Sequence, residues 1–512
     1  MLKKRWTIVI VCLAMFTTLM FLGVGLFQID FSKNETQIFN EFNELKDKYA
    51  KGEEQYGHCA RYYNNNKDKL KVDDLSTLEE TYLELKPIRA SKNAYNKGVN
   101  LYEKNYYTEA INELSNVIEE DVEYYSKAKE LIDTIKVKGI KDVITKADYL
   151  AKGYYYDEAI ELVENIVDDY YDEDIVTKQV EKYKNQKSNL VQYEGEVSHV
   201  FFHSLIADTT KAFDGDAMEQ GYNDWMTTVD EFNKMIEQMY DRGYILIDIH
   251  SLYNEVEDEE GNIYLEPASL MLPEGKKPFV LSVDDVNYYK YMEGDGFASK
   301  MVLDEDGNVA CVFKTDDGKE IIDRDYDVVP LLDKFVEDNP DFSYKGAKGI
   351  LALTGYEGVL GYRTDPKDDL PELEEEINNA KEVVERLKET GWQFASHSYG
   401  HRHMNDISYN LFKKDTKMWD EEVMSIVGPT DIYIYPYGEE VDFDDPKFQL
   451  LQDYGFKIFC GVWNKPFYRI YENSMRMTRR NLDGFILRGN PKAVEDLFDP
   501  YEVIDRSRPD FR

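Results

Sequence analysis

The feature that most constrains the fold is a series of short apolar runs in the second half of the chain, each ending in polar or glycine-rich sequence. Helical patterns, such as TTVDEFNKMIEQMYDRG and ELEEEINNAKEVVERLKETG, separate several of these runs. Strands that alternate with helices predict a parallel β/α architecture from about residue 195. In such a fold, functional side chains lie at the carboxyl ends of the strands. The runs are VSHVFFHSLIAD, GYILIDIHSLY, KPFVLSVDDVNYY, AKGILALTGYEG, GWQFASHSYGH, TDIYIYPYGEE and GFKIFCGVW.

Residues 300–325 do not follow this alternation. They predict a β-hairpin with turns at Asp306-Gly307 and Asp317-Gly318. We expect this hairpin to be an insertion near residues 295–330 that lies over the mouth of the barrel.

The first part of the chain has helical patterns and an internal repeat. Residues 31–90 have apolar residues at three- and four-residue spacing, which predicts a helical stalk or a first helical pair. The stretch GVNLYEKNYYTEAINEL, from Gly98, matches ADYLAKGYYYDEAIEL, from Ala147, at an offset of 49 residues. This pattern resembles tetratricopeptide repeats, whose usual period is about 34 residues, so residues 91–190 would contain an extra helix or a long connection.

The repeat also allows two environments for its tyrosines. They could fill the seam between packed helices, which we favour, or they could line a groove that binds a protein partner. The tyrosines concerned are Tyr106, Tyr107, Tyr155 and Tyr156.

The N-terminus predicts a membrane anchor. Lys3, Lys4 and Arg5 precede an uncharged segment of 22 residues, Trp6–Phe27. At about 1.5 Å per residue this segment is long enough for a bilayer core of about 30 Å. The cations should stay on the cytoplasmic side. Residues 1–30 would then be a cytoplasmic stub and a single membrane-spanning helix, with the rest of the chain outside the cell. A cleaved signal peptide is the alternative, but no A-x-A-like site follows the segment.

Composition excludes several classes of function. The formal net charge of −40 argues against nucleic acid as a partner, because binding it requires clustered Lys and Arg. The four cysteines include Cys12 in the apolar segment and three others far apart, which argues against a disulfide framework and against a cysteine zinc site.

Two neighbouring carboxylates end one of the apolar runs. Asp284 and Asp285 directly follow the predicted strand Phe279–Val283. At a metal site one such carboxylate can bind the cation while the other takes a proton from water. An Asp pair that only caps the next helix is the alternative.

The stretch FASHSYGHRH, Phe394–His403, contains three of the seven histidines of the chain. His397 and His401 are four residues apart, which on a helical turn places both on one face, as two ligands of a zinc ion require. A solvent-exposed loop rich in histidine is the alternative. His403 is expected to be a bystander or a supporting residue.

Taken together with YPYG at Tyr435–Gly438, these elements resemble carbohydrate esterase family 4, the polysaccharide deacetylases with a NodB-homology domain. The motifs of this family are an Asp-Asp pair after a strand, H-[ST]-x-x-H, and Arg-x-Pro-Tyr, for which some members have YPYG. The resemblance covers about residues 195–490. It implies a distorted (β/α) barrel over residues 195–512, preceded by the all-α repeat region and the anchor.

The resemblance also implies roles. Asp284 would be the general base, and a divalent cation, Zn²⁺ or another transition metal, would be bound by Asp285, His397 and His401. The residues lining the substrate and oxyanion region would be Tyr435, Pro436 and Tyr437.

The chain departs from the family pattern at two places. Ile434 stands where the third motif has its arginine, and Arg479 or Arg480 could orient Asp284 instead. The C-terminal Leu-x-His that supplies the general acid is missing. His203, after Phe202, resembles the permuted arrangement of poly-N-acetylglucosamine deacetylases and would be the acid. A core-facing histidine satisfied by backbone is the alternative.

These observations lead to one expected function and two alternatives. The expected function is metal-dependent hydrolysis of N-acetyl groups on an N-acetylhexosamine polysaccharide at the cell surface or in the cell wall. A catalytically inactive glycan-binding module is the first alternative, because of Ile434 and the missing histidine. A helical-repeat scaffold at the membrane surface is the second.

Overall fold

The computed structural model describes residues 34–511 except 169–170 and 316. The predicted membrane anchor, Trp6–Phe27, lies outside this range. Within the range described, no helix combines the length and the apolar character that crossing a bilayer requires.

The described chain forms two compact units. One contains the residues up to Thr145 together with Leu162–Gln179, and the other contains Lys146–Glu161 and all residues from Val180 onward. The last three of the N-terminal helices contribute residues to both units. The N-terminal helices are α2 (Glu35–Ala50), α3 (Tyr56–Asn66), α4 (Val72–Leu83), α5 (Leu85–Glu103), α6 (Tyr107–Leu114), α7 (Tyr125–Lys152), α8 (Tyr156–Glu164) and α9 (Glu173–Ser188).

The internal repeat of the sequence corresponds to two short connections between helices that have the same backbone conformation. Asn105 lies between α5 and α6, and Tyr154 lies at the equivalent place between α7 and α8; both have a positive φ, 61° and 70°. Gly98 of α5 lies so close to α6 that a β-carbon there would come within 2.6 Å of Leu114 Cγ. Helical hairpins are therefore present, while their assignment to tetratricopeptide repeats stays a prediction.

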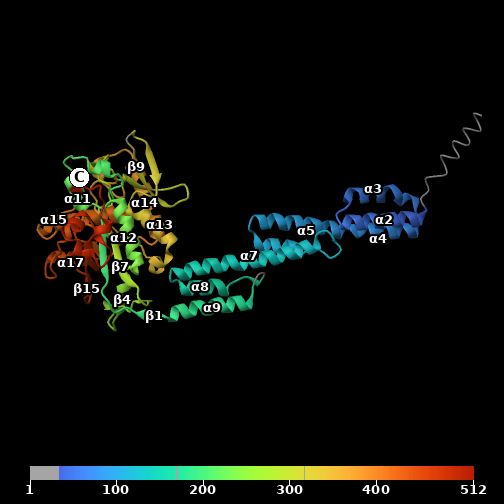
Figure 1. The fold of residues 1–512 in the computed structure, drawn as a ribbon, viewed down its shortest axis with the longest axis horizontal. Coiled ribbons are helices and arrows are strands. Elements are labelled where there is room, and N and C mark those ends of the chain that lie inside the picture. The colour runs from blue at the N-terminus through green and yellow to red at the C-terminus, as the bar shows by residue number, and fades with distance from the viewer. Residues whose placement is uncertain (1–33, 169–170, 316, 512) are drawn as a thin grey trace, which may run out of the picture. The chain divides into compact units, whose positions relative to one another are not determined.

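Seven parallel strands form a closed barrel in the second unit (Figure 1). Their order around the barrel is β7, β11, β12, β13, β14, β16, β2 and back to β7. The α/β barrel predicted from the alternation of strands and helices is thus confirmed. The barrel strands are β2 (Ser198–Phe202), β7 (Lys277–Asp284), β11 (Ile350–Leu353), β12 (Gln393–Ser396), β13 (Ile432–Ile434), β14 (Ile458–Val462) and β16 (Met475–Asn481).

Further strands extend the barrel or form small sheets beside it. β3 (Tyr244–Leu246) pairs with the first residues of β7, and β15 (Phe467–Ile470) runs antiparallel to β16. Residues 300–323 form a three-stranded antiparallel sheet in the region where the sequence predicts a hairpin. The small sheets consist of β8 (Lys300–Leu303), β9 (Val309–Lys314) and β10 (Glu320–Asp323); β4 (Tyr253–Glu257) and β5 (Ile263–Pro267); and β1 (Leu190–Gln192) and β6 (Met271–Pro273).

Amphipathic helices cover the barrel, and α12 shows why they form. Thr228 and Glu231 make reciprocal side-chain to backbone hydrogen bonds at its start, a capping box that satisfies two free N–H groups. Its buried residues recur every three or four positions and face the strands. The helices of the barrel unit are α10 (Thr209–Ala212), α11 (Glu219–Trp225), α12 (Val229–Asp241), α13 (Val328–Asp338), α14 (Leu373–Glu389), α15 (Tyr409–Met418), α16 (Met424–Val427), α17 (Pro446–Asp453), α18 (Gly484–Gly489) and α19 (Pro500–Val503).

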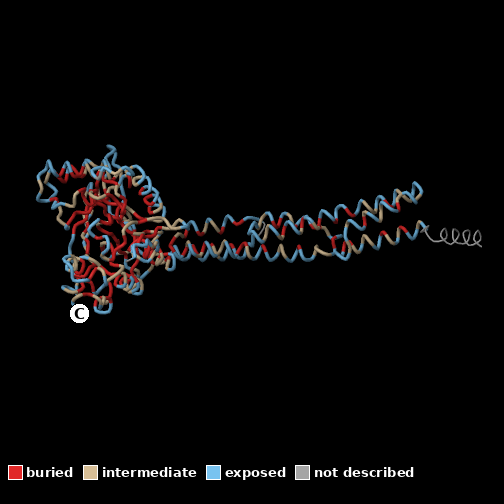
Figure 2. The backbone as a smooth tube through the Cα atoms, turned by 90° about the horizontal axis from the view of Figure 1, so that it is seen from above, coloured by how far each residue is buried: buried red, intermediate tan, exposed pale blue. Residues whose placement is uncertain are grey.

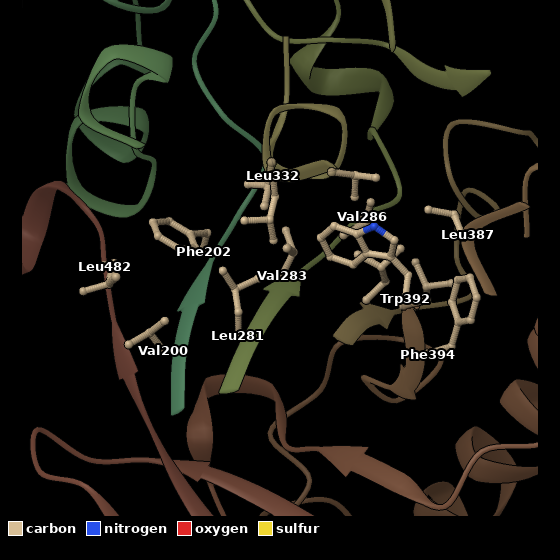
Figure 3. Packing of buried hydrophobic residues seen from close by; sticks show 14 of the residues in the cluster. Val200, Phe202, Leu281, Val283, Val286, Leu332, Leu387, Trp392, Phe394 and Leu482 are labelled. Atoms are coloured by element: carbon tan, nitrogen blue, oxygen red, sulfur yellow. The ribbon is translucent and has the colours of Figure 1, made fainter. Parts of the chain in front are cut away.

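The barrel strands β2 and β7 are buried along almost their whole length, as expected for parallel strands covered by helices, and buried residues fill the interior of this unit (Figure 2). Successive side chains of a strand point to opposite faces. Val200, Phe202, Leu281 and Val283 belong to one apolar cluster that also contains Trp392 (Figure 3). On the other face of these strands, His199, Ser282 and Asp284 carry polar groups that are linked by hydrogen bonds through one another and Arg479. This alternation brings the candidate catalytic side chains into one environment.

Candidate active site

Asp284 ends β7 and is almost fully buried, as is the arginine that contacts it. Arg479 of β16 donates from Nη1 to Asp284 Oδ1 at 2.6 Å. Burial, the largest single influence, would raise the pKa of Asp284, but the charge and hydrogen bond of Arg479, together with His397 and His203, outweigh it and hold this pKa well below its usual range. Asp284 is therefore a carboxylate throughout the neutral range. Of the two arginines predicted to orient it, the structure brings Arg479 to this place.

Arg480 has different partners. It donates to Asp496 at 2.6 Å and to Ser198 at 3.1 Å. Neighbouring residues of a strand point to opposite faces, which explains why only one of the two arginines contacts Asp284.

Asp285 follows β7 in a left-handed backbone conformation, with φ 58°. This conformation is uncommon for residues other than glycine and turns the side chain away from the strand direction. Tyr289 donates from its hydroxyl to Asp285 Oδ1 at 2.7 Å, and the other carboxylate oxygen lies 3.6 Å from His401 Nε2. Asp285 thus presents one oxygen to the histidine loop.

His397 follows β12 and is buried. Its Nδ1 donates to the carbonyl oxygen of Ile434 at 2.8 Å, so Nε2 is the nitrogen left as an acceptor, and Nε2 lies 3.9 Å from Asp284 Oδ2. Burial lowers the pKa of His397 to about 4, although Asp284 and Asp285 act in the opposite direction. Its imidazole is therefore neutral at pH 7, as a metal ligand must be.

His401 has a φ of 45° and lies beside Tyr437, whose φ is 60°. The His401 Nδ1 and the Tyr437 hydroxyl are 3.1 Å apart, and the hydroxyl also lies 3.4 Å from the His401 carbonyl oxygen. If the hydroxyl donates to that carbonyl and accepts from Nδ1–H, Nε2 of His401 is left free toward Asp285. Tyr437 thereby holds the orientation of the histidine ring.

Asp285, His397 and His401 fit a divalent cation. One ligand atom from each residue can be chosen so that all three lie within 4.8 Å of one another. The Nδ1 atoms of both histidines have partners of their own, which is the usual arrangement around metal-binding imidazoles. One carboxylate and two imidazoles are a common donor set for zinc and for neighbouring transition metals.

His203 follows β2, next to β7 in the barrel, and is half-buried. It lies close enough to Asp284 to lower the pKa of that carboxyl electrostatically, and it acts in the same way on Asp483. Asp483 is buried at the start of α18, where burial raises its pKa. His203 therefore lies near both carboxyl groups, at the carboxyl end of the barrel.

A polar chain continues from the site into the barrel. Arg479 Nη1 also lies 3.2 Å from Ser282 Oγ, which lies 3.0 Å from Nε2 of His199. Burial holds the pKa of His199 well below its usual range, so its ring is neutral. With Arg479 donating to Ser282, the serine hydroxyl donates to His199.

Several predicted residues lie beside the site instead of within it. Tyr435 and Pro436 are buried, and Tyr435 packs against Tyr433, so these two residues support Tyr437 from below. His403 is exposed, stacks on the Tyr437 ring at 4.0 Å and pairs with Glu439 at 3.0 Å.

Sequence reasoning missed four residues of the site: Tyr289, Asp483, Ser282 and His199. Tyr289 could have been found, because it stands four residues after Asp285 in the same loop. Ser282 and His199 could have been found by following the period of two backward from Asp284 and His203. Asp483 has no such signal.

The fold and the site define this unit as an α/β barrel with a candidate metal-binding active site at the carboxyl ends of its strands. Residues 372–459 match the family model described as polysaccharide deacetylase, so the chain carries a polysaccharide deacetylase domain. The family resemblance inferred from the motifs is thus confirmed, and the domain is that of a hydrolase of the carbohydrate esterase type. The matched range contains His397 and His401.

Similar solved structures include two deacetylases. The Streptococcus pyogenes deacetylase PplD in complex with acetate is 13% identical, with 60% of this chain and 99% of that chain covered and a TM-score of 0.33. The polysaccharide deacetylase BA0330 from Bacillus anthracis is 14% identical, with 57% of this chain and 66% of that chain covered and a TM-score of 0.32. Comparison with curated proteins finds no significant match.

Proposed function

We propose that the barrel is a metal-dependent enzyme that removes N-acetyl groups from an N-acetylhexosamine polysaccharide. The observation that carries this proposal is the place of Asp284, a buried carboxylate held by Arg479 directly beside the candidate ligand His397. A base next to a cation site is what hydrolysis of an unreactive amide requires.

Asp285, His397 and His401 would hold the cation. A cation held there would supply Lewis-acid polarisation of the acetamide carbonyl and stabilisation of the negative charge on its oxygen. The Tyr437 N–H, at the rim of the site, is the backbone donor proposed to add to this stabilisation.

Asp284 and His203 would divide the proton transfers. Asp284 takes a proton from the water that attacks the carbonyl carbon. When the C–N bond breaks, His203 gives a proton to the leaving nitrogen, so that acetate and a free amine result. The nearness of His203 to Asp284, the proposed base, supports this assignment, because both groups must act on the same scissile amide.

The cellular location of the protein is also part of the proposal. The charges and length of the N-terminal segment favour a single-pass anchor in the cell membrane with the barrel outside the cell, where such polysaccharides lie. The helical region would be a spacer, or would bind a protein partner.

The first test is acetate release by the full chain from N-acetylglucosamine oligomers and from peptidoglycan, after chelation and with Zn²⁺ added back. Release restored by the metal supports the proposal. Zn²⁺ binding without acetate from either glycan would favour the alternative of an inactive glycan-binding module. That alternative rests on Ile434 and on the missing C-terminal histidine; Arg479, which contacts Asp284, answers the first of these grounds.

A further inference from the structure

A pair of aromatic side chains is exposed beside the candidate active site. Trp225, the last residue of α11, and Phe485, in the first turn of α18, have nearly parallel rings at 5.4 Å, with an interplanar angle of 19°. Trp225 is 50% exposed and Phe485 is 52% exposed. Two large apolar side chains that stack on each other and still face water form a small exposed apolar patch, and patches of this kind are often functional.

The pair lies at the same end of the barrel as the catalytic side chains. Phe485 is two residues after Asp483, which interacts with His203, and α18 begins directly beyond β16. Thr227, two residues after Trp225, donates from Oγ1 to the carbonyl of Leu482 at 2.6 Å. β16, β2 and β7 are neighbours in the barrel, so the strand that leads into α18 is two strand spacings, roughly 10 Å, from the strand that carries Asp284.

The backbone under the pair is held from below by a buried arginine. Arg508 makes a fully buried ion pair with Glu231 and donates to the carbonyls of Asn223 and Met226, each at 2.8 Å, on either side of Trp225. The same guanidinium packs on Gly484, where a β-carbon would come within 2.3 Å of Arg508 Nη1. Arg508 therefore fixes both segments that carry the aromatic rings.

The pair also has a polar edge. Arg488 of α18 forms an ion pair with Asp224, next to Trp225, and both side chains keep some exposure. An apolar ring face beside charged hydrogen-bonding groups suits a pyranose ring, which has a face of C–H groups and an edge of hydroxyls. A protein partner would more often need a larger apolar area than two rings provide.

We propose that Trp225 and Phe485 form a platform that binds a sugar residue of the polysaccharide beyond the one that is deacetylated. This inference rests on the proposed function, because its occupant is the same polymer. Its consequence is a preference for long chains, because only a chain with sugar residues beyond the reacting one contacts the platform while it is seated at Asp284.

The test is calorimetric binding of N-acetylglucosamine disaccharide and hexamer to the full chain with Zn²⁺, in the Asp284→Asn background so that the glycan is not consumed. Trp225→Ala and Phe485→Ala should weaken hexamer binding about tenfold, the loss of roughly one aromatic contact. Trp225→Phe should restore most of it. Tyr501→Ala, which removes an exposed aromatic side chain on α19, is the matched control and should bind as the parent does.

The outcomes separate this inference from the proposed function. Hexamer binding that is unchanged in Trp225→Ala, or disaccharide binding that falls as much as hexamer binding, overturns the platform. Hexamer binding that depends on Trp225, combined with no acetate release by the chain that retains Asp284, supports the platform and overturns the enzyme.

Discussion

Arg479 Nη1 lies 2.6 Å from Asp284 Oδ1, although β16 and β7, which carry these residues, are separated in the barrel by β2. Both side chains are buried, so neither charge is stabilised by water. A buried ion pair of this kind depends on both partners, because removing one leaves the other charge uncompensated. The pair therefore links the stability of the barrel to the ionisation of the proposed base.

Replacement of Arg479 should affect both stability and activity. In Arg479→Met we expect the free energy of unfolding to fall by about 3–5 kcal/mol, because the Asp284 carboxylate stays buried without a counter-charge. The depressed pKa of Asp284 stabilises the fold above its unfolded-state pKa of about 4, and this contribution is lost as the pH falls through the folded-state pKa. The difference between the two proteins should thus be largest at neutral pH and narrow in acid. Urea unfolding at a series of pH values measures it.

The control for this experiment is Arg469→Ala, which removes an exposed arginine on β15. Its unfolding free energy should change by less than about 0.5 kcal/mol. An Arg479→Met protein as stable as the parent at pH 7 would contradict the importance of the ion pair. Acetate release should also fall at least about 100-fold, in line with loss of a general base.

Substitution of a candidate ligand should abolish metal binding, whereas substitution of the proposed base should not. We expect His397→Ala and Asp285→Ala to lose stoichiometric Zn²⁺ and acetate release together, because each removes one of three ligands. Asp284→Asn should keep the metal and lose activity. Metal analysis after dialysis measures the first property, and acetate release the second.

His403→Ala is the matched control for the metal experiment. It removes a histidine from the same loop that contacts Tyr437 and Glu439 instead of the candidate ligands. Metal retained in His397→Ala, or lost in His403→Ala, would show that the ligands are assigned to the wrong residues.

The role of His203 can be tested by comparing two substrates whose leaving groups differ in their need for a proton. An amine must be protonated as it leaves, whereas a nitrophenolate leaves without a proton. We therefore expect His203→Gln to reduce kcat on N-acetylglucosamine oligomers about 100-fold or more, the usual contribution of a general acid. The same variant should reduce cleavage of 4-nitrophenyl acetate much less. Equal losses on both substrates would indicate that His203 acts through structure alone.

The sequence predicted the barrel because strand period, helix period and turn residues agree along the second half of the chain. It also placed the Asp pair and the histidines at strand ends, which meet at one end of the barrel, and the family resemblance then implied Asp285, His397 and His401 as the ligands. It could not choose between Arg479 and Arg480, because that choice depends on which face of β16 is inside the barrel. Asp483 was missed for a related reason: its nearness to His203 depends on the pairing of β16 with β2.

At the opposite end of the barrel, His250 should make stability depend on pH. Its ring nitrogens lie 2.9 Å from Asp248 and 2.9 Å from Asp431. Burial acts against the charge, but the two carboxylates raise the pKa of His250 to about 10. The contribution is fully present below the unfolded-state pKa of about 6.5 and is lost as the pH rises through 10.

We therefore expect His250→Gln to lower the free energy of unfolding by about 1–2 kcal/mol at pH 6, a value reduced for the partial exposure of the ring. The difference should shrink above pH 10. Urea unfolding at pH 6 and pH 10.5 measures it, with His58→Gln on α3 as a control, because that histidine is exposed and faces a single carboxylate. A difference that grows with pH would contradict the assignment of a charged His250.

Gly98 should be required for the close packing of α5 on α6. A β-carbon at this position would come within 2.6 Å of Leu114 Cγ, and Leu114 is buried. Alanine favours a helix over glycine by about 1 kcal/mol, but forcing a methyl group into a packed interface costs about 1–3 kcal/mol. We therefore expect Gly98→Ala to leave stability unchanged or lower it by up to about 2 kcal/mol. Gly57→Ala on α3 is the matched control: its nearest neighbour would be Arg61 at 3.9 Å, so helix propensity alone should raise stability by about 0.5–1 kcal/mol. Thermal unfolding followed by circular dichroism compares the two, and a gain in Gly98→Ala equal to that in Gly57→Ala would show that the helices can move apart without cost.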